Sequence, residues 1–222
     1  NTTNGGTTWT AQTSATGLGL NGVYFVDANT GWCVGRNGVI QTTSNGGTTW
    51  TLQTSSGGVW LNDVHFANST TGWAVGQTGQ IEHTSNGGTT WTTQANPTGS
   101  TAELRDVHFI DANTGWIVGE GSTVYHTTNG GTTWTSQTGA AGVYWGIYFI
   151  DSNNGWAVGN AAAIMHTTNG GTTWTAQTPP MGATSNLAKV HFVNATHGWA
   201  VGDNSGIFHT SSGGLPVELT NF

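Results

Sequence analysis

The chain consists of short segments in which apolar and polar residues alternate, separated by turns rich in Gly, Asn and Thr. The pattern returns every 40 to 43 residues. Its second copy contains four such segments, at residues 61–66, 73–76, 80–84 and 89–92. Asn86-Gly87 separates the last two, and this dipeptide favours a hairpin because both residues tolerate positive φ. No segment keeps helical periodicity for three turns, so each repeat is predicted to form four short antiparallel strands.

Two phrases mark every repeat. The first is Thr-x-Asn-Gly-Gly-Thr-Thr-Trp, which we call the box, and the second is Gly-Trp-x-Val-Gly. Each occurs five times, and the two stay in phase. We expect their Asn and Trp residues to be structural, with the indoles packing between neighbouring sheets. These residues are Asn4, Trp9, Trp32, Asn45, Trp50, Trp73, Asn86, Trp91, Trp116, Asn129, Trp134, Trp156, Asn169, Trp174 and Trp199.

A repeat of this length built from four strands is typical of a β-propeller blade. The sequence therefore predicts an all-β fold, a five-bladed propeller over residues 1–214, with four antiparallel strands in each blade. The chain opens on an outer strand, residues 7–10, and its last repeat stops at a third strand, residues 206–210. We expect the N-terminal strand to close the last blade, because closure removes the open sheet edges of a linear array.

The C-terminal residues 215–222 complicate this count. They follow a decayed box and stand where the outer strand of the last blade should be, which gives six candidate outer strands for five blades. One interpretation is a linker that leaves the propeller. The other is that a terminal strand completes a blade of a neighbouring copy, and such additions give filaments when they do not close.

Composition excludes several classes of partner. Only 6% of the 222 residues are charged, the formal net charge is −7, and the basic residues are Arg36, Arg105 and Lys189. Nucleic acid is a poor partner, because phosphate contacts need clustered Lys and Arg. No apolar run approaches the roughly 20 residues of a membrane-spanning helix, so we expect no membrane insertion. The single cysteine, Cys33, takes a place held by Ala or Ile in other repeats, which favours a small buried residue.

The box resembles the Asp-box, or BNR repeat, whose pattern is Ser-x-Asp-x-Gly-x-Thr-Trp. Its pairing with Gly-Trp-x-Val-Gly resembles the propellers of the photosystem II stability/assembly factor-like group, many of which are secreted bacterial proteins. This chain has Asn where that family often has Asp. The resemblance implies a structural box that braces a turn by side-chain hydrogen bonds, with no chemistry attached.

The closing residues Leu215–Phe222 resemble the start of the sorting domain carried by cargo of the type IX secretion system. Together with the Thr-rich, Lys-poor composition, this resemblance implies a secreted protein at the extracellular surface. N-glycosylation patterns at Asn1, Asn68 and Asn194 fit a secreted glycoprotein, although such patterns arise easily in a Thr-rich chain.

Asp-box propellers include glycosidases, so the acidic residues are candidates for a catalytic role. A sialidase holds its substrate carboxylate with three arginines, and this chain has two; other glycosidases need a carboxylate pair across a cleft. Asp27, Asp111 and Asp151 share one turn position of the repeat. Glu103 and Glu120 fall outside the repeat pattern and could face a rim. We expect no catalytic residue, no cofactor and no enzymatic activity.

Histidines recur at two positions and could in principle converge on a metal. Because Tyr replaces His at one of the two positions, we favour packing between blades or a hydrogen-bonded core histidine, and we expect no metal site. The first position holds His83, His126, His166 and His209, and the second holds His65, His108, His191, Tyr24 and Tyr148.

Three aromatic residues break the repeat where the first strand of a blade begins: Trp60, Tyr144 and Trp145. They are candidate ligand-binding residues, because rim aromatics suit sugar stacking or protein contact. Packing under a loop is the alternative. The sequence thus predicts a secreted, non-catalytic structural or surface protein that can polymerise with itself through a terminal strand. The alternative is a lectin-like module that binds glycans, or a protein-binding module.

Overall fold

A computed structural model describes residues 1–55, 57–96, 101–121, 124–137, 142–179, 182–204 and 206–212. The chain divides into two compact units, Asn1–Gln94 and Ala95–Phe222, called unit 1 and unit 2. The predicted linker or extra strand at 215–222 lies outside the described residues. The prediction of a single propeller over residues 1–214 stays a prediction.

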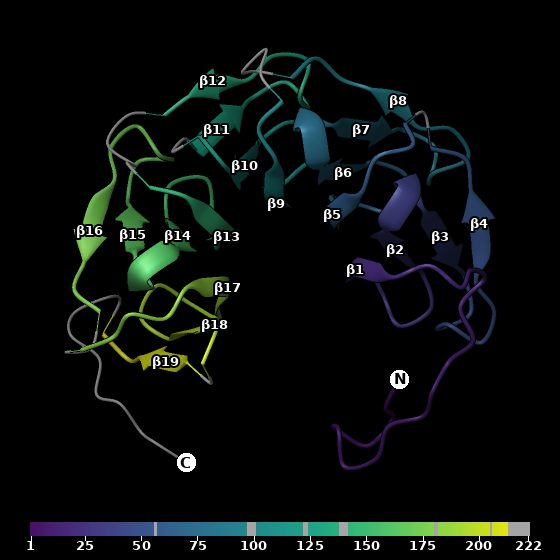
Figure 1. The fold of residues 1–222 in the computed structure, drawn as a ribbon, viewed down its shortest axis with the longest axis horizontal. Helices are drawn as coiled ribbons and strands as arrows, with labels where there is room; N and C mark the ends of the chain where they lie inside the picture. The colour runs from purple at the N-terminus through teal and green to yellow at the C-terminus, as the bar shows by residue number, and fades with distance from the viewer. Residues whose placement is uncertain are drawn as a thin grey trace. The chain divides into compact units, whose positions relative to one another are not determined.

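Unit 1 contains two four-stranded antiparallel sheets, each a meander in sequence order (Figure 1). A 3-10 turn joins the second and third strands of each sheet. The first sheet contains β1 (Leu20–Phe25), β2 (Gly31–Gly35), η1 (Arg36–Gly38), β3 (Ile40–Thr43) and β4 (Thr51–Gln53). The second contains β5 (Leu61–Phe66), β6 (Gly72–Gly76), η2 (Gln77–Gly79), β7 (Ile81–Thr84) and β8 (Thr92–Thr93).

Unit 2 contains three more sheets with the same order of strands. The third sheet is β9 (Leu104–Phe109), β10 (Gly115–Gly119), β11 (Val124–Thr127) and β12 (Thr135–Ser136). The fourth is β13 (Tyr144–Phe149), β14 (Gly155–Gly159), η3 (Asn160–Ala162), β15 (Ile164–Thr167) and β16 (Thr175–Gln177). The fifth shows three strands among the described residues, β17 (Leu187–Phe192), β18 (Gly198–Gly202) and β19 (Ile207–Thr210).

The all-β class and the five sheets agree with the sequence prediction. The described helices are 3-10 turns of three residues, and none has the length or apolarity of a membrane-spanning segment. Closure of the last blade by residues 7–10 stays a prediction: β1 is the first strand of the chain, and residues 7–10 form none. An extended segment needs a neighbour for its backbone N–H and C=O groups before it becomes a strand.

The outer strands begin later than their sequence suggests. Residues 89–92 are predicted as a strand, but β8 begins at Thr92. Thr89 and Thr90 belong to the box turn instead, where the backbone N–H of Thr90 donates to Oδ1 of Asn86 at 3.0 Å. A short polar side chain that captures backbone donors in this way competes with the strand ladder.

Asparagine braces each box turn, as the fourth sheet shows. Oδ1 of Asn169 accepts hydrogen bonds from the backbone N–H of Thr173 at 2.9 Å and from Oγ1 of Thr167 at 3.0 Å. The N–H of Gly171 donates to Oγ1 of Thr167 at 2.9 Å. Gly170 and Gly171 have φ values of 69° and 90°, a region that favours glycine. The two glycines and the Asn of the box are therefore requirements of the turn itself.

Neighbouring sheets are joined by stacked aromatic rings. In unit 2, the indole of Trp116 lies parallel to the ring of Phe149 on the next sheet, with centroids 3.5 Å apart. Trp156 stacks on Phe192 in the same way, also at 3.5 Å. The box residue Trp174 meets Phe149 edge-on at 5.9 Å. Unit 1 repeats the arrangement with Trp32 on Phe66, so the second strand of one sheet packs on the first strand of the next.

The second glycine of Gly-Trp-x-Val-Gly is required by close packing. A Cβ atom on Gly159 would collide with the carbonyl oxygen of Val143, which precedes the first strand of the same sheet. Gly119 meets Glu103 in the same way. The register of the first strand also shifts there, between Tyr144 and Gly146 in the fourth sheet. This close approach brings the residues around the start of each first strand next to the following turn.

Candidate functional site

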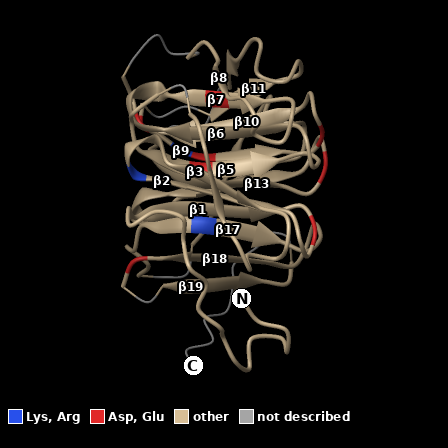
Figure 2. Cartoon of the chain, turned by 90° about the vertical axis from the view of Figure 1, so that its right-hand side faces the viewer, with Lys and Arg blue, Asp and Glu red and all other residues tan. Residues whose placement is uncertain are grey.

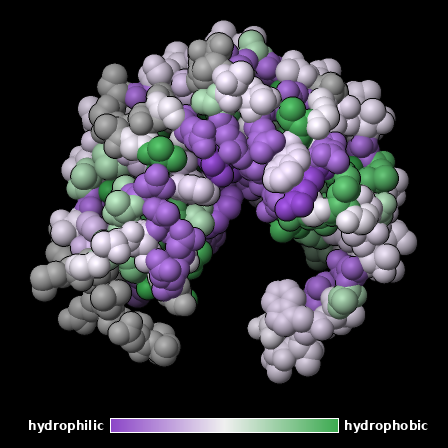
Figure 3. Space-filling model, in the orientation of Figure 1, coloured by the Kyte–Doolittle hydropathy of each residue, from purple (hydrophilic) through white to green (hydrophobic). Residues whose placement is uncertain are grey.

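Charged residues are few, and most of the cartoon is neither blue nor red (Figure 2). A cluster of charged side chains lies in unit 2 around the start of β9, where the surface is hydrophilic (Figure 3). Nη2 of Arg105 lies 2.9 Å from Oε2 of Glu103 and 2.9 Å from Oε1 of Glu120. The predicted rim position of Glu103 and Glu120 is therefore occupied by an ion-pair cluster, in which two carboxylates surround one guanidinium.

This cluster fixes the indole of Trp145. The guanidinium carbon of Arg105 lies 4.1 Å from the centroid of the indole, within the range of a cation–π contact. Nε1 of Trp145 donates a hydrogen bond to Oδ1 of Asn160 at 2.6 Å. The indole is thus held on one face and one edge while remaining partly exposed.

A small hollow adjoins the same indole. Trp145 lines it together with Asn186, Leu187, Ala188 and Asp203. Nδ2 of Asn186 donates to Oδ2 of Asp203 at 3.2 Å. The hollow therefore combines an aromatic wall and an apolar floor with one carboxylate, a combination suited to a side chain with an apolar stem and a polar or cationic tip. We call Trp145 and these four residues the Trp145 surface.

Below this surface a buried carboxylate connects the three sheets of unit 2. Asp106 of β9 accepts hydrogen bonds from the backbone N–H of Ile147 on β13 at 2.8 Å and from Nζ of Lys189 on β17 at 2.5 Å. Asp106 is buried, whereas Lys189 is half exposed. Each carboxylate oxygen accepts one of these hydrogen bonds, so Asp106 acts as an anchor between sheets.

His108, on the same strand, is a second contact between sheets. Its Nε2 lies 2.9 Å from the carbonyl oxygen of Phe149, and its ring packs on Tyr148 at 4.8 Å. A carbonyl only accepts, so Nε2 carries the hydrogen. Burial lowers the pKa of His108 to about 4, although the nearby carboxylate of Asp106 acts in the opposite direction. The histidine is consequently neutral at pH 7 and serves packing.

The structure requires one correction to the predicted binding residues. Tyr144 is completely buried in the core cluster that contains Trp116 and Phe149, and it cannot contact a ligand at the surface. Successive side chains of a strand point to opposite faces, so Tyr144 faces the core and Trp145 faces outward. A signal existed in the sequence, because the equivalent residues Leu61 and Leu104 are apolar and buried.

Trp60, the third predicted residue, lies in unit 1. It is exposed, and the guanidinium carbon of Arg36 lies 4.6 Å from its ring centroid. Trp60 and Trp145 are thus alike: each has an indole that is at least partly exposed, with an arginine over one face. A ligand-binding role for either stays a prediction.

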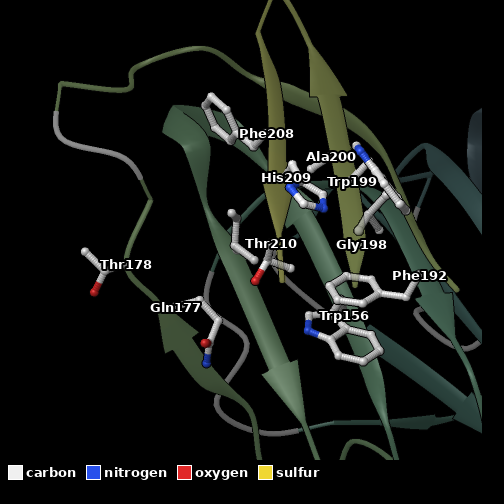
Figure 4. A pocket seen from close by; sticks show the side chains of 12 residues that line it. Trp156, Gln177, Thr178, Phe192, Gly198, Trp199, Ala200, Phe208, His209 and Thr210 are labelled. Carbon is white, nitrogen blue, oxygen red and sulfur yellow. The ribbon is translucent and has the colours of Figure 1, made fainter. Parts of the chain in front are cut away.

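Sequence reasoning missed a second hollow, beside β19 (Figure 4). Phe192 and Trp156 form one wall, Gln177 and Thr178 lie opposite, and Phe208 and Thr210 belong to the edge strand. In the preceding sheet the box residue Trp174 meets the equivalent ring, Phe149, edge-on. The sequence does hold a signal: the decayed box that begins at Thr210 has no Trp at its end, unlike the five complete boxes.

The acidic turn residue Asp151 and the repeated histidines His126 and His166 make contacts within the fold. Asp151 accepts hydrogen bonds in its turn; burial raises its pKa, but the bonds from Asn154 and Asn153 outweigh this and lower it. His126 and His166 stack on the indoles of Trp116 and Trp156, and burial lowers the pKa of both histidines. Within the described ranges, no group of three His, Cys, Asp or Glu side chains could hold a metal ion.

Cys33 is buried, as its apolar neighbours in the sequence suggested. Burial raises the pKa of its thiol to about 11, and a hydrogen bond with Gln41 offsets this only in part. The thiolate, which is the reactive form of cysteine, is therefore scarce at pH 7.

The family can now be assigned from the whole chain. The family described as photosynthesis system II assembly factor YCF48 matches residues 1–97, 51–141, 96–179 and 135–218. The chain belongs to this YCF48 family. The resemblance inferred from the box and from Gly-Trp-x-Val-Gly is thereby confirmed, whereas the match does not test the resemblance of Leu215–Phe222 to a sorting domain. No curated protein matches the chain in sequence.

Solved structures show a β-propeller fold: the WD40 β-propeller domain of Doa1 is 13% identical with a TM-score of 0.70, over 88% of this chain and 66% of that one. A structure of YCF48 bound to D1 peptide is 22% identical with a TM-score of 0.70, over 88% of this chain and 64% of that one. YCF48 from Cyanidioschyzon merolae is 20% identical with a TM-score of 0.67, over 89% and 68%. The GH74 enzyme of Niastella koreensis is 21% identical with a TM-score of 0.66, over 91% and 31%. The chain thus spans less than two thirds of the peptide-bound YCF48.

Proposed function

We propose that this chain is a non-catalytic propeller that binds a segment of a partner protein at the Trp145 surface. The observation that carries the proposal is the fixed, partly exposed indole beside a hollow. Arg105 and Asn160 hold the ring in place before any partner arrives, and a preorganised aromatic anchor loses little entropy on binding. A structure of YCF48 bound to D1 peptide supports protein binding within the family.

The charges around the hollow indicate the chemistry of the partner. Asp203 lines it, and Glu103 and Glu120 lie around Arg105, whose charge they neutralise. The chain as a whole carries a formal net charge of −7. A neutral or basic segment with one apolar or long cationic side chain fits these groups, whereas an acidic segment would be repelled.

The absence of catalysis is part of the proposal. The carboxylates near the Trp145 surface are engaged with Arg105, Lys189, Asn186 and a backbone N–H. A glycosidase needs two carboxyl groups that face each other across a substrate cleft. Groups already used as structural partners are poor candidates for that role.

A second candidate function is an extracellular structural or surface protein that assembles with itself. The specific observation in its favour is the fifth sheet, where β19 forms an edge among the described residues. An extracellular location rests on the Thr-rich, Lys-poor composition and on the sorting-domain-like tail, which lies outside the described residues. Glycan binding at Trp60 or Trp145 stays a prediction.

Fluorescent peptides test the proposed function. The full chain is titrated with basic, neutral and acidic peptides that share one Leu and one Tyr, and binding is followed by fluorescence anisotropy. We expect the basic peptide to bind most tightly, and Trp145→Ala to weaken it at least about tenfold, as for an interface hot spot. Leu52→Ala, an exposed apolar residue of unit 1, is the matched control and should leave binding unchanged.

Two results would contradict the proposal. One is equal affinity of Trp145→Ala and the unmodified chain. The other is an absence of binding to every peptide in the set. Thermal unfolding of Trp145→Ala verifies that the variant is folded, since the indole is partly exposed and contributes little to the core.

A further inference from the structure

The N-terminal residues of unit 1 lie where the outer strand of a preceding sheet would lie, but they form no strand. Asn4 makes the same hydrogen bonds in its box as Asn45 does in the next one, including those that connect it to the following Thr. Nε2 of Gln12 donates to the carbonyl oxygen of Gly46 at 2.7 Å. One repeat later, Gln53 of β4 donates to Gly87 at 3.0 Å. Residues 10–12 therefore lie against the first sheet as β4 lies against the second.

The face of the first sheet beside this segment is uncovered. Val23 of β1 is 64% exposed, whereas its equivalent in the second sheet, Val64, is 2% exposed because the first sheet covers it. Leu20 and Phe25 of the same strand are exposed as well. An open hollow lies between this face and the N-terminal segment, lined by Gln12 and Val23 among others. Hydrophobic surface shows over β1 in Figure 3. Unit 1 thus offers a segment in the position of an outer strand, beside an exposed apolar face of β1.

Unit 2 offers the complement. Its fifth sheet shows three strands within the described ranges and exposes an apolar face. Trp199 is 40% exposed and Ile207 is 64% exposed. The equivalent of Trp199 in the fourth sheet, Trp156, is fully buried under Phe192. No phenylalanine of the described part of unit 2 stacks on Trp199. The third and fourth sheets each stack a Trp on a Phe of the next sheet, and the fifth sheet shows no such stack among the described residues.

The hollow beside β19 is lined by the same residue types that surround a box indole in another sheet. In the second sheet, the box residue Trp91 meets Phe66 edge-on and donates from Nε1 to Oε1 of Gln53 on the preceding sheet at 3.2 Å. The hollow beside β19 presents the equivalent residues, Phe192 and Gln177 (Figure 4). The box residue Trp9, in contrast, is 74% exposed. Among the described residues, no indole other than the lining Trp156 and Trp199 lies in this hollow, and the box indole of Trp9 in unit 1 is exposed.

We propose that copies of this chain associate head to tail by strand addition. Residues 10–12 of one copy pair with β19 of the next copy as its fourth strand. Trp9 enters the hollow against Phe192, and Phe25 stacks on Trp199. The contact joins two different surfaces, so its repetition produces a chain of subunits. This inference does not depend on peptide binding at the Trp145 surface.

A second copy is the occupant that the surfaces themselves specify. The two faces carry the Trp, Phe and Gln residues that already join sheets within each unit. Residues 10–12 hold the place of an outer strand in unit 1, and the fifth sheet shows no outer strand among its described residues. The backbone of Thr10 is bonded to Asn1, whose terminal amine donates to its carbonyl oxygen at 2.9 Å, and this pair opens when residues 10–12 join β19. The tail of the same copy, residues 213–222, and closure within one copy are the competing occupants, and the following experiment separates them.

The first measurement is the size of the full chain as a function of concentration, by mass photometry and electron microscopy. We expect assemblies that lengthen with concentration. Trp9→Ala and Ile207→Glu should each raise the concentration needed for assembly at least about tenfold, because an interface anchor is lost or a charge is buried. The matched controls are Trp60→Ala, an exposed indole at another place, and Leu52→Glu, an exposed apolar residue of β4. Both controls should assemble like the unmodified chain.

Mixing the two variants gives the decisive result. Trp9→Ala keeps an intact β19 face, and Ile207→Glu keeps an intact N-terminal segment. Each alone should remain a monomer, and the equimolar mixture should form a one-to-one complex that grows no further. A mixture that stays monomeric overturns the proposal. So does an unmodified chain that is monomeric at every concentration, the result expected if its own tail or its own N-terminal segment fills the hollow.

Discussion

The fourth and fifth sheets contain the same pentapeptide, Gly-Trp-Ala-Val-Gly, in different surroundings. In β14 all five residues are buried, whereas in β18 both Trp199 and Val201 are exposed. The hydrogen-bond register with the first strand is the same in both sheets, including the irregularity near its start. Identical sequence and identical backbone pairing therefore do not decide burial, because the covering surface belongs to the next sheet. In a repeat protein, each sheet contributes half of an interface.

The largest expected effect comes from removing the two equivalent indoles. Trp156→Ala should lower the free energy of unfolding by about 3–5 kcal/mol, because it removes a fully buried ring stacked on Phe192. Trp199→Ala should cost about 1 kcal/mol or less in dilute solution, where its face is open to water. Urea unfolding of both variants, followed by circular dichroism, measures the difference.

Equal losses for the two variants would mean that Trp199 is covered in a single copy. That outcome would also contradict the open face on which the proposed head-to-tail contact depends. Trp156→Phe is a useful companion variant, because it keeps an aromatic ring against Phe192 and should recover part of the loss.

The pH dependence of stability should distinguish the partly buried His108, which joins two sheets, from the exposed His191 of the fifth sheet. The unfolded chain protonates His108 near pH 6.5, whereas burial lowers the pKa in the folded state to about 4. Between these values the unfolded state binds more protons, so stability falls as the pH is lowered from about 6.5 to about 4. The loss should be about 2 kcal/mol, less than full burial would give, because the ring is partly accessible.

His108→Gln should remove the part of this dependence that exceeds the contributions of His83, His126 and His166, whose pKa values burial also lowers, and urea midpoints between pH 7 and pH 4 measure it. The groups that face His108 are Asp106, Lys189, His191 and Tyr148. His191, at the same place in β17 but exposed, supplies the matched control, and His191→Gln should keep most of the dependence. A profile unchanged by His108→Gln would exclude this histidine as its origin.

The smallest effect concerns the box turns. Asn169 braces the hairpin between β15 and β16, so Asn169→Ala should cost about 1 kcal/mol, roughly the net value of a lost hydrogen bond or two. Asn4 makes the same bonds, but the residues after it form no strand, and Asn4→Ala should cost less than half as much. Thermal unfolding compares the two. Equal costs would indicate that residues 7–10 are paired in solution.

Much of the fold could be predicted because the relevant signals are local. The box specifies a turn through Asn169, Thr167 and two glycines, all within five residues. Alternation specifies a strand, and the constant order of the signals specifies a meander. The start of the outer strand was misplaced because Asn86 captures the backbone of Thr90, a competition that alternation does not reveal.

The candidate site was predicted only in part. Trp145 was identified as an aromatic outside the repeat, but its partners Arg105 and Asn160 lie 40 and 15 residues away and carry no shared pattern. Tyr144 was misassigned because the sequence does not state which of two adjacent aromatics faces the core; alignment with Leu104 would have settled it.

The sequence by itself determined the repeat, the order of strands and the turn chemistry, because these depend on residues a few positions apart. Tertiary structure alone decided which side of each strand faces its neighbour, how Asp106 connects three sheets and which copies of a repeated residue remain uncovered. The physical reason is that hydrophobic burial depends on area removed from water by a neighbouring surface. Sheets with the same repeated sequence therefore differ in burial when the surfaces that lie against them differ.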